Sequence, residues 1–389
     1  MRSLLFWLPV FFLYFERALP VEQVLRLSAL YYLGTVLFEV PSGYLSDRVG
    51  RRPTLVAAMA ASVLGSALFL GAAEFWTFAL GQLCYAASTA FVSGTDTALL
   101  FDSLRALGRE KEHAESEGRM QAASFAALAL ASLVGGLLAG FDLRLAYLLS
   151  LAGSAAALVV ALRLVEPQRS PARPFLGQLA DCVRQLSDPA LRWVLAFAVG
   201  MFVLNHVPFE FLQPWVGFLL GAAQGGWSPT PAVAGAVLGA TMLVSSFVSG
   251  RVGRLRQRLG ARGTLLCACA LQTVLLWGMA SAVHVALLPL LALRSVPQAL
   301  GIPVTRAEIH PRVAPGLRAT YLSLQSLAGR LSFTACLALA SEVSAGAAWT
   351  AAELSSVLRA FAWGGVGLAL LLALTGRALL AQASRDSKA

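Results

Sequence analysis

The chain has 389 residues, of which 58% are hydrophobic and only 13% are charged, and its mean hydropathy is +0.71. Soluble domains carry about 25% charged residues, so this composition excludes an ordinary soluble protein and places the chain in the membrane class. The formal net charge of +10 does not indicate nucleic-acid binding, because no basic stripe interleaved with aromatic residues accompanies it.

Apolar segments separated by charged residues, glycines and prolines follow one another along the whole chain. A helix needs about 20 apolar residues to cross a bilayer, so this pattern predicts about twelve transmembrane helices. We therefore expect an all-α membrane protein built from two pseudo-symmetric lobes of six helices. The predicted spans are 3–16, 25–46, 53–72, 75–101, 119–140, 144–163, 190–213, 231–250, 263–282, 284–304, 318–341 and 354–380.

The first predicted span is short. From Met1 to Glu16 a helix would rise only about 24 Å, less than the roughly 30 Å of a hydrocarbon core. Two explanations stay open at this stage. Either the helix is truncated at its cytoplasmic end, for example by a misplaced start, or the membrane thins there.

The segment 164–189, which contains VEPQRSPARP, separates the two blocks of spans and includes the longest polar stretch. It is predicted as a cytoplasmic linker between an N-terminal lobe, 1–163, and a C-terminal lobe, 190–389. Arginines gather in alternate loops and near the C-terminus, which by the positive-inside rule places both termini in the cytoplasm. We expect a monomeric, multi-pass protein of the cell inner (cytoplasmic) membrane.

Motifs for catalysis and for metal binding are absent from the sequence. It has no Walker A, HExxH or GxSxG motif, and its cysteines and histidines lack metal-ligand spacing. We therefore predict no enzymatic activity, no cofactor and no metal ion. The first apolar run leads into another span without an A-x-A-like site, so a cleavable signal peptide is not expected.

Residues 43–52, GYLSDRVGRR, interrupt the apolar sequence between the second and third predicted spans. Gly50 permits a tight turn, Pro53 can begin the next helix, and Gly43 allows close approach of a neighbouring helix. Internal repeats of helical blocks are typical of two-lobed transporters. A displaced copy of the stretch follows in the second block, where Gly253, Gln257, Arg258, Leu259, Gly260 and Arg262 correspond to Gly43, Asp47, Arg48, Val49, Gly50 and Arg52.

The sequence FEVPSGYLSDRVGRR resembles motif A of the major facilitator superfamily, in which a Gly is followed after three residues by Asp-Arg, one residue and Gly-Arg-Arg. The number of spans, the lobe boundary and the second copy extend the resemblance over the whole chain. It implies a secondary transporter in which two lobes alternately open a central site to either side of the membrane.

The resemblance also implies a latch on the cytoplasmic side. Asp47 would dock on the N-terminus of the eleventh helix near Arg318, and Arg51 would pair with Asp102 at the end of the fourth. Gln257 stands where Asp47 stands, so we expect an asymmetric latch in which the first lobe holds the acid. The alternative is a solvated turn that serves only topology. The predicted latch residues are Gly43, Asp47, Arg48, Gly50, Arg51, Arg52, Asp102 and Arg119.

Two patterns of drug exporters in the superfamily are weakened. Gln82 stands in place of their arginine in the fourth helix, and Ala86 in place of a glycine. The fifth helix keeps Gly135 and Gly136 but lacks the preceding proline. These departures weaken the prediction of proton antiport without excluding it.

Charged residues inside membrane spans are costly and are therefore candidates for function. Glu39 is expected either to make structural hydrogen bonds or to carry protons. Asp96 is expected either to face a substrate or to form a salt bridge with Arg119. His206 can titrate near physiological pH, although a lone helical histidine is often hydrogen-bonded packing.

Arg294 and Arg330 lie near the middle of the tenth and eleventh predicted spans. Since guanidinium groups keep their charge, each needs an acid, carbonyl oxygens or an anionic ligand. Glu210 is the expected protein partner, which leaves one cation in excess. The substrate or coupling candidates are Glu39, Asp96, His206, Glu210, Arg294 and Arg330.

The leading functional prediction is proton-coupled export of a small organic molecule. Proton-linked or facilitated uptake of an anionic or zwitterionic small molecule is an alternative, and a transporter-like lipid flippase is another. The expected partners are a small-molecule substrate, protons and the lipid bilayer, and no nucleic acid.

Overall fold

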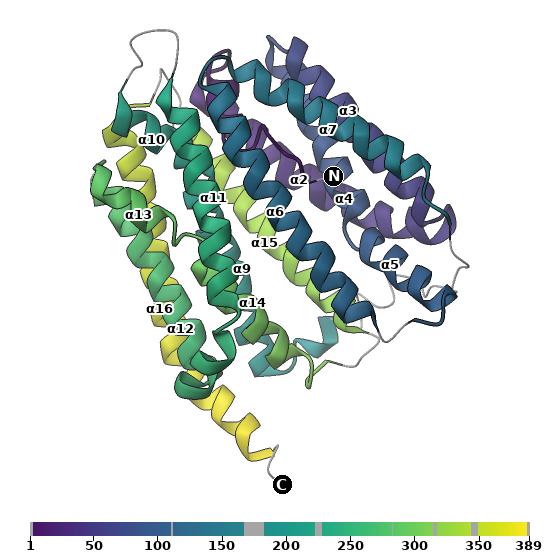
Figure 1. Cartoon of the computed structure of the whole chain (residues 1–389). Coiled ribbons are helices and arrows are strands. Elements are labelled where there is room, and N and C mark those ends of the chain that lie inside the picture. Colours follow the sequence, from purple (N-terminus) through teal and green to yellow (C-terminus); the bar gives the residue numbers. More distant parts are fainter. Residues whose placement is uncertain are drawn as a thin grey trace. The chain divides into compact units, whose positions relative to one another are not determined.

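The structure is a computed structural model, and every regular element that it describes is a helix (Figure 1). It describes residues 3–109, 112–166, 183–221, 228–281, 283–313, 317–343 and 349–386. The prediction of an all-α membrane protein is confirmed.

The chain divides into two compact units. Unit 1 comprises Met1–Ala172, Leu220–Gly239 and Leu337–Ala348, and unit 2 comprises Arg173–Leu219, Ala240–Cys336 and Trp349–Ala389. The lobes predicted at 1–163 and 190–389 stay a prediction. The helices of unit 1 are α1 (Phe11–Glu16), α2 (Val21–Arg48), α3 (Arg51–Gly71), α4 (Phe75–Val92), α5 (Thr95–Ala106), α6 (His113–Ala139) and α7 (Leu143–Leu162). Those of unit 2 are α9 (Pro189–Glu210), α10 (Leu212–Leu220), α12 (Val252–Ser281), η2 (Val285–Leu287), α13 (Leu288–Leu291), α14 (Val296–Ile309) and α16 (Ala351–Asp386). Two further helices, α11 (Pro229–Ser249) and α15 (Arg318–Val343), are divided between the units, and the last residue of α10, Leu220, belongs to unit 1.

In the described part of the chain, 10 helical stretches are long and apolar enough to cross a membrane. They correspond to the third to twelfth predicted spans. The second predicted span coincides with α2, which has 28 residues. The first, 3–16, consists of turns followed by α1, which has only 6 residues.

Some predicted spans are broken rather than continuous. The span predicted at 75–101 separates into α4 and α5 at Gly94, whose φ of 75° is a left-handed conformation that glycine adopts without steric cost. The tenth span is interrupted between α13 and α14, and Arg294 lies in this interruption. Irregular backbone at membrane depth needs protein or water around it. Arg294 is buried at its break, whereas Gly94 is exposed.

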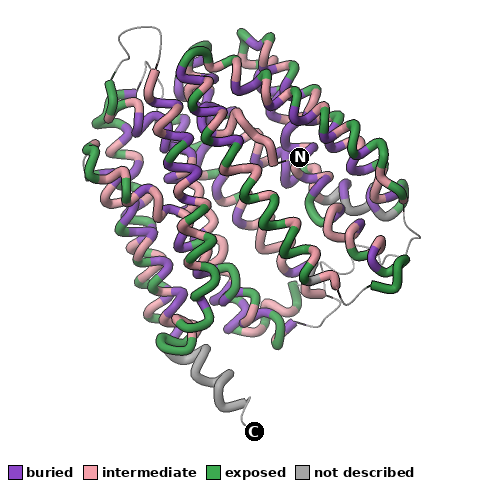
Figure 2. The backbone as a smooth tube through the Cα atoms, viewed as in Figure 1, coloured by how far each residue is buried: buried purple, intermediate pink, exposed green. Residues whose placement is uncertain are grey.

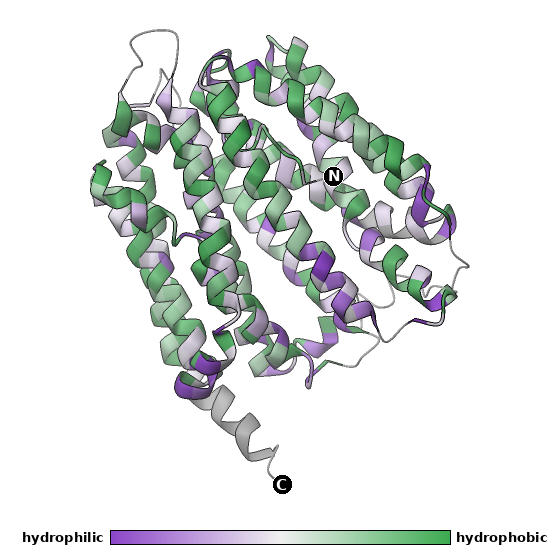
Figure 3. Cartoon of the chain, in the orientation of Figure 1, coloured by the Kyte–Doolittle hydropathy of each residue, from purple (hydrophilic) through white to green (hydrophobic). Residues whose placement is uncertain are grey.

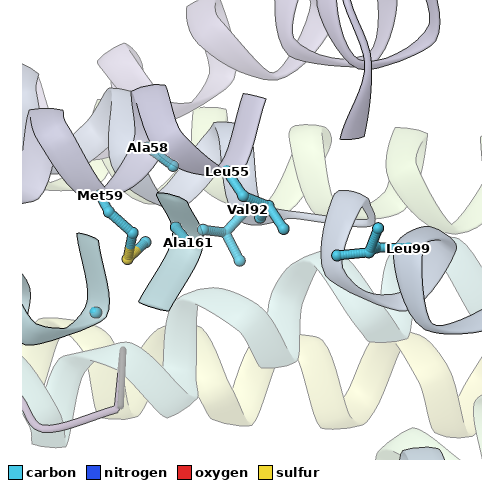
Figure 4. Close-up of a cluster of buried hydrophobic side chains, with 7 residues drawn as sticks. Leu55, Ala58, Met59, Val92, Leu99 and Ala161 are labelled. Carbon is cyan, nitrogen blue, oxygen red and sulfur yellow. The ribbon is translucent and has the colours of Figure 1, made fainter. Parts of the chain in front are cut away.

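A compact hydrophobic cluster joins four helices of unit 1, α3, α4, α5 and α7. Small alanine side chains allow α3 and α7 to approach, and leucine, methionine and valine fill the space between the helices (Figure 4). Burial of each large aliphatic side chain contributes about 1.5–3 kcal/mol relative to water. The cluster consists of Leu55, Ala58, Met59, Val92, Leu99, Ala157 and Ala161.

Aromatic side chains hold the short α1 in place. The Tyr14 hydroxyl donates to the Phe69 carbonyl oxygen at 2.8 Å, and the Phe15 ring lies 5.3 Å from Phe69 and 5.2 Å from Phe78, measured between ring centroids. Such aromatic pairs add about 0.5–1.5 kcal/mol each beyond burial. The first span is thus fixed by side-chain packing although it is too short to cross a bilayer as a helix.

Buried polar side chains tie the helices of unit 2 together. Trp193 Nε1 on α9 donates to the Leu372 carbonyl of α16 at 3.1 Å, and Gln272 Nε2 on α12 donates to the Leu204 carbonyl of α9 at 2.8 Å. Both donors are buried. Hydrogen bonds of this kind fix which helix faces meet in an otherwise apolar interior.

Large apolar side chains are exposed on the outer helices of each unit (Figure 2). Leu64, Leu148 and Trp363 are examples, with 52%, 47% and 63% of their surface exposed. Hydrophobic residues run along the helices, and hydrophilic ones gather mainly near helix ends (Figure 3). A soluble protein would not expose so much apolar surface, whereas lipid-facing helices require it.

Small residues bring α6 and α11 into close contact within unit 1. A Cβ added to Gly136 would collide with the Pro231 carbonyl oxygen, and one added to Gly235 would collide with the Ser132 carbonyl oxygen. In membranes, where apolar side chains gain little by leaving lipid, such close backbone packing is a principal source of helix association.

We predict that Gly136→Ala destabilises the purified protein by about 1–3 kcal/mol, since the new methyl group overpacks this crossing. Thermal unfolding in detergent measures the effect. Gly118→Ala is the matched control, because Gly118 is also in α6 and an added Cβ there meets nothing within 4 Å. Equal unfolding temperatures for the two variants would contradict the prediction.

Candidate functional site

The turn between α2 and α3 is built around Gly50. Its φ of 127° lies in the range that favours glycine, as expected from the turn prediction. A helix start leaves its first backbone N–H groups without intrahelical partners. Here the amides of Arg51 and Arg52 donate to the two carboxylate oxygens of Glu166 at 2.8 and 2.7 Å. Pro53 has no N–H and the Thr54 amide donates to the Gly50 carbonyl, so the backbone N–H groups of this helix start are accounted for.

The side chains of the two arginines bind neighbouring helices. Arg51 Nε lies 3.5 Å from an Asp102 carboxylate oxygen of α5, and Arg51 Nη1 donates to Ser46 Oγ at 2.8 Å. Arg52 donates to the Leu162 carbonyl at the end of α7 at 2.8 Å. The pairing of Arg51 with Asp102 that the motif implies is confirmed, and it joins the start of α3 to α5.

The structure tests the other predicted latch residues less fully. The surroundings of Gly43 and the side chain of Asp47 are outside what the structure describes. The docking of Asp47 on the eleventh helix therefore stays a prediction. Arg48 ends α2 and is exposed. Arg119 pairs with Glu115 in α6, so the expected salt bridge from Asp96 to Arg119 is wrong. Residues four apart face each other on the surface of one helix, which brings Glu115 within reach of Arg119.

Glu166 was missed by sequence reasoning, which placed it in the linker 164–189. The structure places it three residues beyond the α7 C-cap, Arg163, where its carboxylate closes the N-terminus of α3. Its charge also complements the positive end of the helix dipole. A lone acid directly after the sixth span, in the sequence LVEPQ, was the available signal.

The second copy of the motif repeats this local structure in unit 2. Gly260 has a φ of 69° and bends α12. The Thr264 hydroxyl donates to the Gly260 carbonyl at 2.8 Å, as the Thr54 hydroxyl donates to Gly50 at 2.7 Å. Arg262 donates to the Ala373 carbonyl of α16, in the way that Arg52 binds α7. The internal repeat is therefore structural as well as sequential.

Unit 2 also has acids that pair with arginines near the second copy of the motif. Glu308, in the last turn of α14, binds Arg256 at 2.7 Å and Arg312 at 3.0 Å. Arg312 Nε lies 4.0 Å from Asp188, which caps α9 through the Ala190 amide. Gln257 replaces Asp47, but Glu308 gives the second copy an ion pair comparable to that between Arg51 and Asp102.

A cavity of about 290 Å³ lies in unit 2 between α9, α14 and α15. Its size is near the lower end of small-molecule sites, and its mixed aromatic and amide lining is typical of them. Its lining residues are Phe197, Ala198, Met201, Phe202, Asn205, Pro297, Gln298, Gly301, Ile302, Thr305, Arg306, Leu322, Gln325 and Ser326.

Arg294 is buried, with 5% of its surface exposed, yet it is not paired with Glu210 as expected. Its guanidinium carbon lies 5.3 Å from the centre of the Phe209 ring, and no described carboxylate lies within ion-pair distance of it. Phe209 precedes Glu210 at the end of α9, so the aromatic face occupies the place predicted for the acid. Arg294 also does not line the cavity.

Arg330 and His206 lie near the cavity without lining it. Arg330 Nε donates to Ser326 Oγ at 3.3 Å, and Ser326 is a lining residue. His206 stacks on the lining residue Phe202 with 4.0 Å between ring centroids, and its Nδ1 bonds the Phe202 carbonyl at 2.7 Å. Since a carbonyl only accepts, Nδ1 carries the proton. This arrangement favours the packing role for His206.

The two carboxylates of the first unit occupy different surroundings. Glu39 is half-buried in α2, and Asp96 is half-buried in the first turn of α5, directly after the break at Gly94. The Thr97 amide donates to Asp96 Oδ1 at 2.8 Å, and a helix N-terminus favours a negative charge. In the described ranges, no group of three or more His, Cys, Asp or Glu residues could hold a metal ion.

The family model described as "Major Facilitator Superfamily" matches residues 2–335. The chain belongs to this family. It is accordingly a multi-pass membrane transporter, and the family resemblance derived from motif A is confirmed.

Similar proteins agree with this assignment. A class G tetracycline resistance protein from Vibrio anguillarum is 27% identical over 349 residues, which cover 84% of this chain and 85% of that protein. The solved nucleoside transporter NupG has a TM-score of 0.80 at 12% identity, with 97% of each chain covered. The POT family transporter PepTSo has a TM-score of 0.73 at 13% identity, with coverage of 98% and 95%. At these identities the solved structures establish the fold alone.

We predict that Glu166→Ala lowers the free energy of unfolding by about 1 kcal/mol or more, because it removes the cap of α3. Thermal or denaturant unfolding of the purified protein measures the change. Glu74→Ala is the control, since Glu74 is also a glutamate beside a helix start, as the N-cap of α4, but its side chain accepts no capping hydrogen bond. A comparable loss in both variants would show that the Glu166 contacts with α3 do not contribute to stability.

Proposed function

We propose that this chain is a secondary transporter that exports a small organic molecule across the cytoplasmic membrane by alternating access, driven by protons. The observation that carries the proposal is the cavity in unit 2, which offers aromatic and polar side chains within the spans of a superfamily member. The tetracycline resistance protein supports the direction, because resistance to a drug is a property that export provides.

Proton coupling is assigned to carboxylates inside the spans. Glu39 and Asp96 are the candidates, because both are half-buried carboxylates within the predicted spans. His206 is a weaker candidate, since its Nδ1 is engaged with a backbone carbonyl. A transporter couples to protons only if protonation changes the relative stability of its conformations.

The contacts at the start of α3 are proposed as part of the switch between conformations. Arg51, Asp102 and Glu166 join the ends of three helices of unit 1. Charged contacts near a membrane face can be replaced by water at modest cost, which suits a group that must form and break during each cycle. Both termini are proposed to lie on this cytoplasmic side.

Uptake of an anionic or zwitterionic molecule is the second candidate. It is favoured by Arg294 and Arg330, neither of which is paired with a carboxylate of the described residues. The two candidates differ in direction and in substrate charge, so one type of vesicle experiment can separate them.

We expect everted membrane vesicles that contain the protein to accumulate a substrate when they are energised, and to lose it when an uncoupler is added. Tetracycline and a panel of aromatic acids are suitable probes, and vesicles without the protein are the control. If uncoupler-sensitive accumulation occurred only in right-side-out vesicles, the proposal of export would be wrong and the protein would be an uptake transporter.

For the coupling step, we predict that Glu39→Gln or Asp96→Asn reduces transport driven by a pH gradient about tenfold or more, equivalent to roughly 1.4 kcal/mol. Exchange of labelled for unlabelled substrate without a gradient should persist, because it needs no net proton movement. Glu117→Gln, at an exposed position of α6, is the control. Unchanged gradient-driven transport in both variants would remove these residues from the coupling mechanism.

A further inference from the structure

The cavity of unit 2 has a charge imbalance. Among its lining residues is one cation, Arg306, and no carboxylate. Arg306 is exposed in the last turn of α14, and its guanidinium makes no hydrogen bond or ion pair with a described residue. A single arginine in the lining of a cavity attracts anions and repels cations over several ångströms.

A second cation lies at another side of the same cavity. Arg330 is one helical turn beyond Ser326, whose hydroxyl accepts from Arg330 Nε. At Gly329, α15 passes so close to α9 that an added Cβ would lie 2.7 Å from the Phe202 ring. Phe202 and Ser326 both line the cavity. The Arg330 side chain is therefore adjacent to the cavity lining.

Arg330 has donors to spare. Its guanidinium carries five N–H groups, and among the described residues only Ser326 accepts from it. A guanidinium within a membrane span is costly unless an anion or several acceptors meet it. No described carboxylate does so, which leaves the planar pair of Nη groups able to bind a carboxylate in two-point fashion.

The rest of the lining suits an apolar body. Phe197, Met201 and Phe202 present one side from α9, and Ile302 presents another from α14. The Phe202 ring is held against His206, and Gly301 lets α14 approach Phe197, with an added Cβ 3.3 Å from that ring. Fixed aromatic walls favour a flat, rigid ligand.

Arg294 provides the internal contrast. It likewise has no described acid beside it, but it is buried over Phe209, whereas the half-buried Arg330 donates to the lining residue Ser326. The aromatic face of Phe209 supplies part of the stabilisation that a ligand would give. Burial of an arginine alone therefore does not define the binding site.

We propose that this cavity binds an organic anion whose carboxylate or sulfonate meets Arg330 and Ser326 while its aromatic or aliphatic body lies against Phe202. Arg306 attracts the anion at the other end. This proposal specifies the substrate class of the proposed transporter. It rests on the proposed function in one respect, namely that this cavity is part of the transport site.

The test uses the full-length purified protein in nanodiscs and two probes of equal shape, 2-naphthoate and its neutral amide, 2-naphthamide. Calorimetry gives the two dissociation constants. We expect the protein to prefer 2-naphthoate about tenfold at low salt, and Arg330→Gln to reduce this preference to about twofold or less. Arg330→Lys keeps the charge but not the two-point geometry, so an intermediate preference is expected.

Arg306→Gln should mainly slow association and reduce the salt dependence of binding, because the Arg306 side chain is exposed. Arg254→Gln is the matched control, since Arg254 is an exposed arginine of unit 2 outside the cavity lining. The preference of the Arg254→Gln variant for 2-naphthoate should equal that of the unchanged protein. If Arg330→Gln does not fold, the same ratio of dissociation constants is measured for Arg330→Lys and Ser326→Ala.

Equal affinity for the two probes, binding of neither probe, or an unchanged preference in the Arg330 variants would overturn the anion site. Failure of the proposed function has a different signature. The protein would then bind 2-naphthoate with the expected preference but would accumulate no probe in energised vesicles of either orientation.

Discussion

The constraint on which this structure depends is that each polar group taken into an apolar helix bundle needs a partner. The start of α3 illustrates it most fully. Two backbone amides bind Glu166, proline supplies no third donor, and the arginine side chains bind Asp102 and the end of α7. The turn at Gly50 can be tight because these charges are neutralised where the chain changes direction.

Unit 2 meets the same constraint at the same point of its repeat with other side chains. Gly260 bends the chain, Thr264 repeats the hydroxyl contact of Thr54, and Arg262 binds the last helix of its unit. The ion pair is formed by other residues, since Glu308 accepts from Arg256 in unit 2 where Asp102 pairs with Arg51 in unit 1. Local geometry is thus retained while the identity of the acid varies, because only charge and reach matter at a partly solvated helix end.

A charged group for which the protein supplies no partner is a candidate for ligand binding. Arg294 is stabilised in part by Phe209, whereas Arg306 and Arg330 border a cavity whose described lining contains no acid. An unmatched cation beside a cavity has an energetic reason to select an anionic ligand. The same residues would disfavour a cationic ligand, which is the physical basis of the proposed anion site.

The sequence by itself determined the all-helical membrane fold, the superfamily, the repeat and the pair between Arg51 and Asp102, because these depend on hydropathy, spacing and a local motif. Only the tertiary structure decided that Glu166 caps α3, that Arg119 pairs with Glu115, and that Phe209 takes the place beside Arg294 expected for Glu210. It also decided which arginines border the cavity. These contacts join residues distant in sequence, or choose among several partners within reach, and hydrophobic periodicity does not specify which side chains meet across two packed helices.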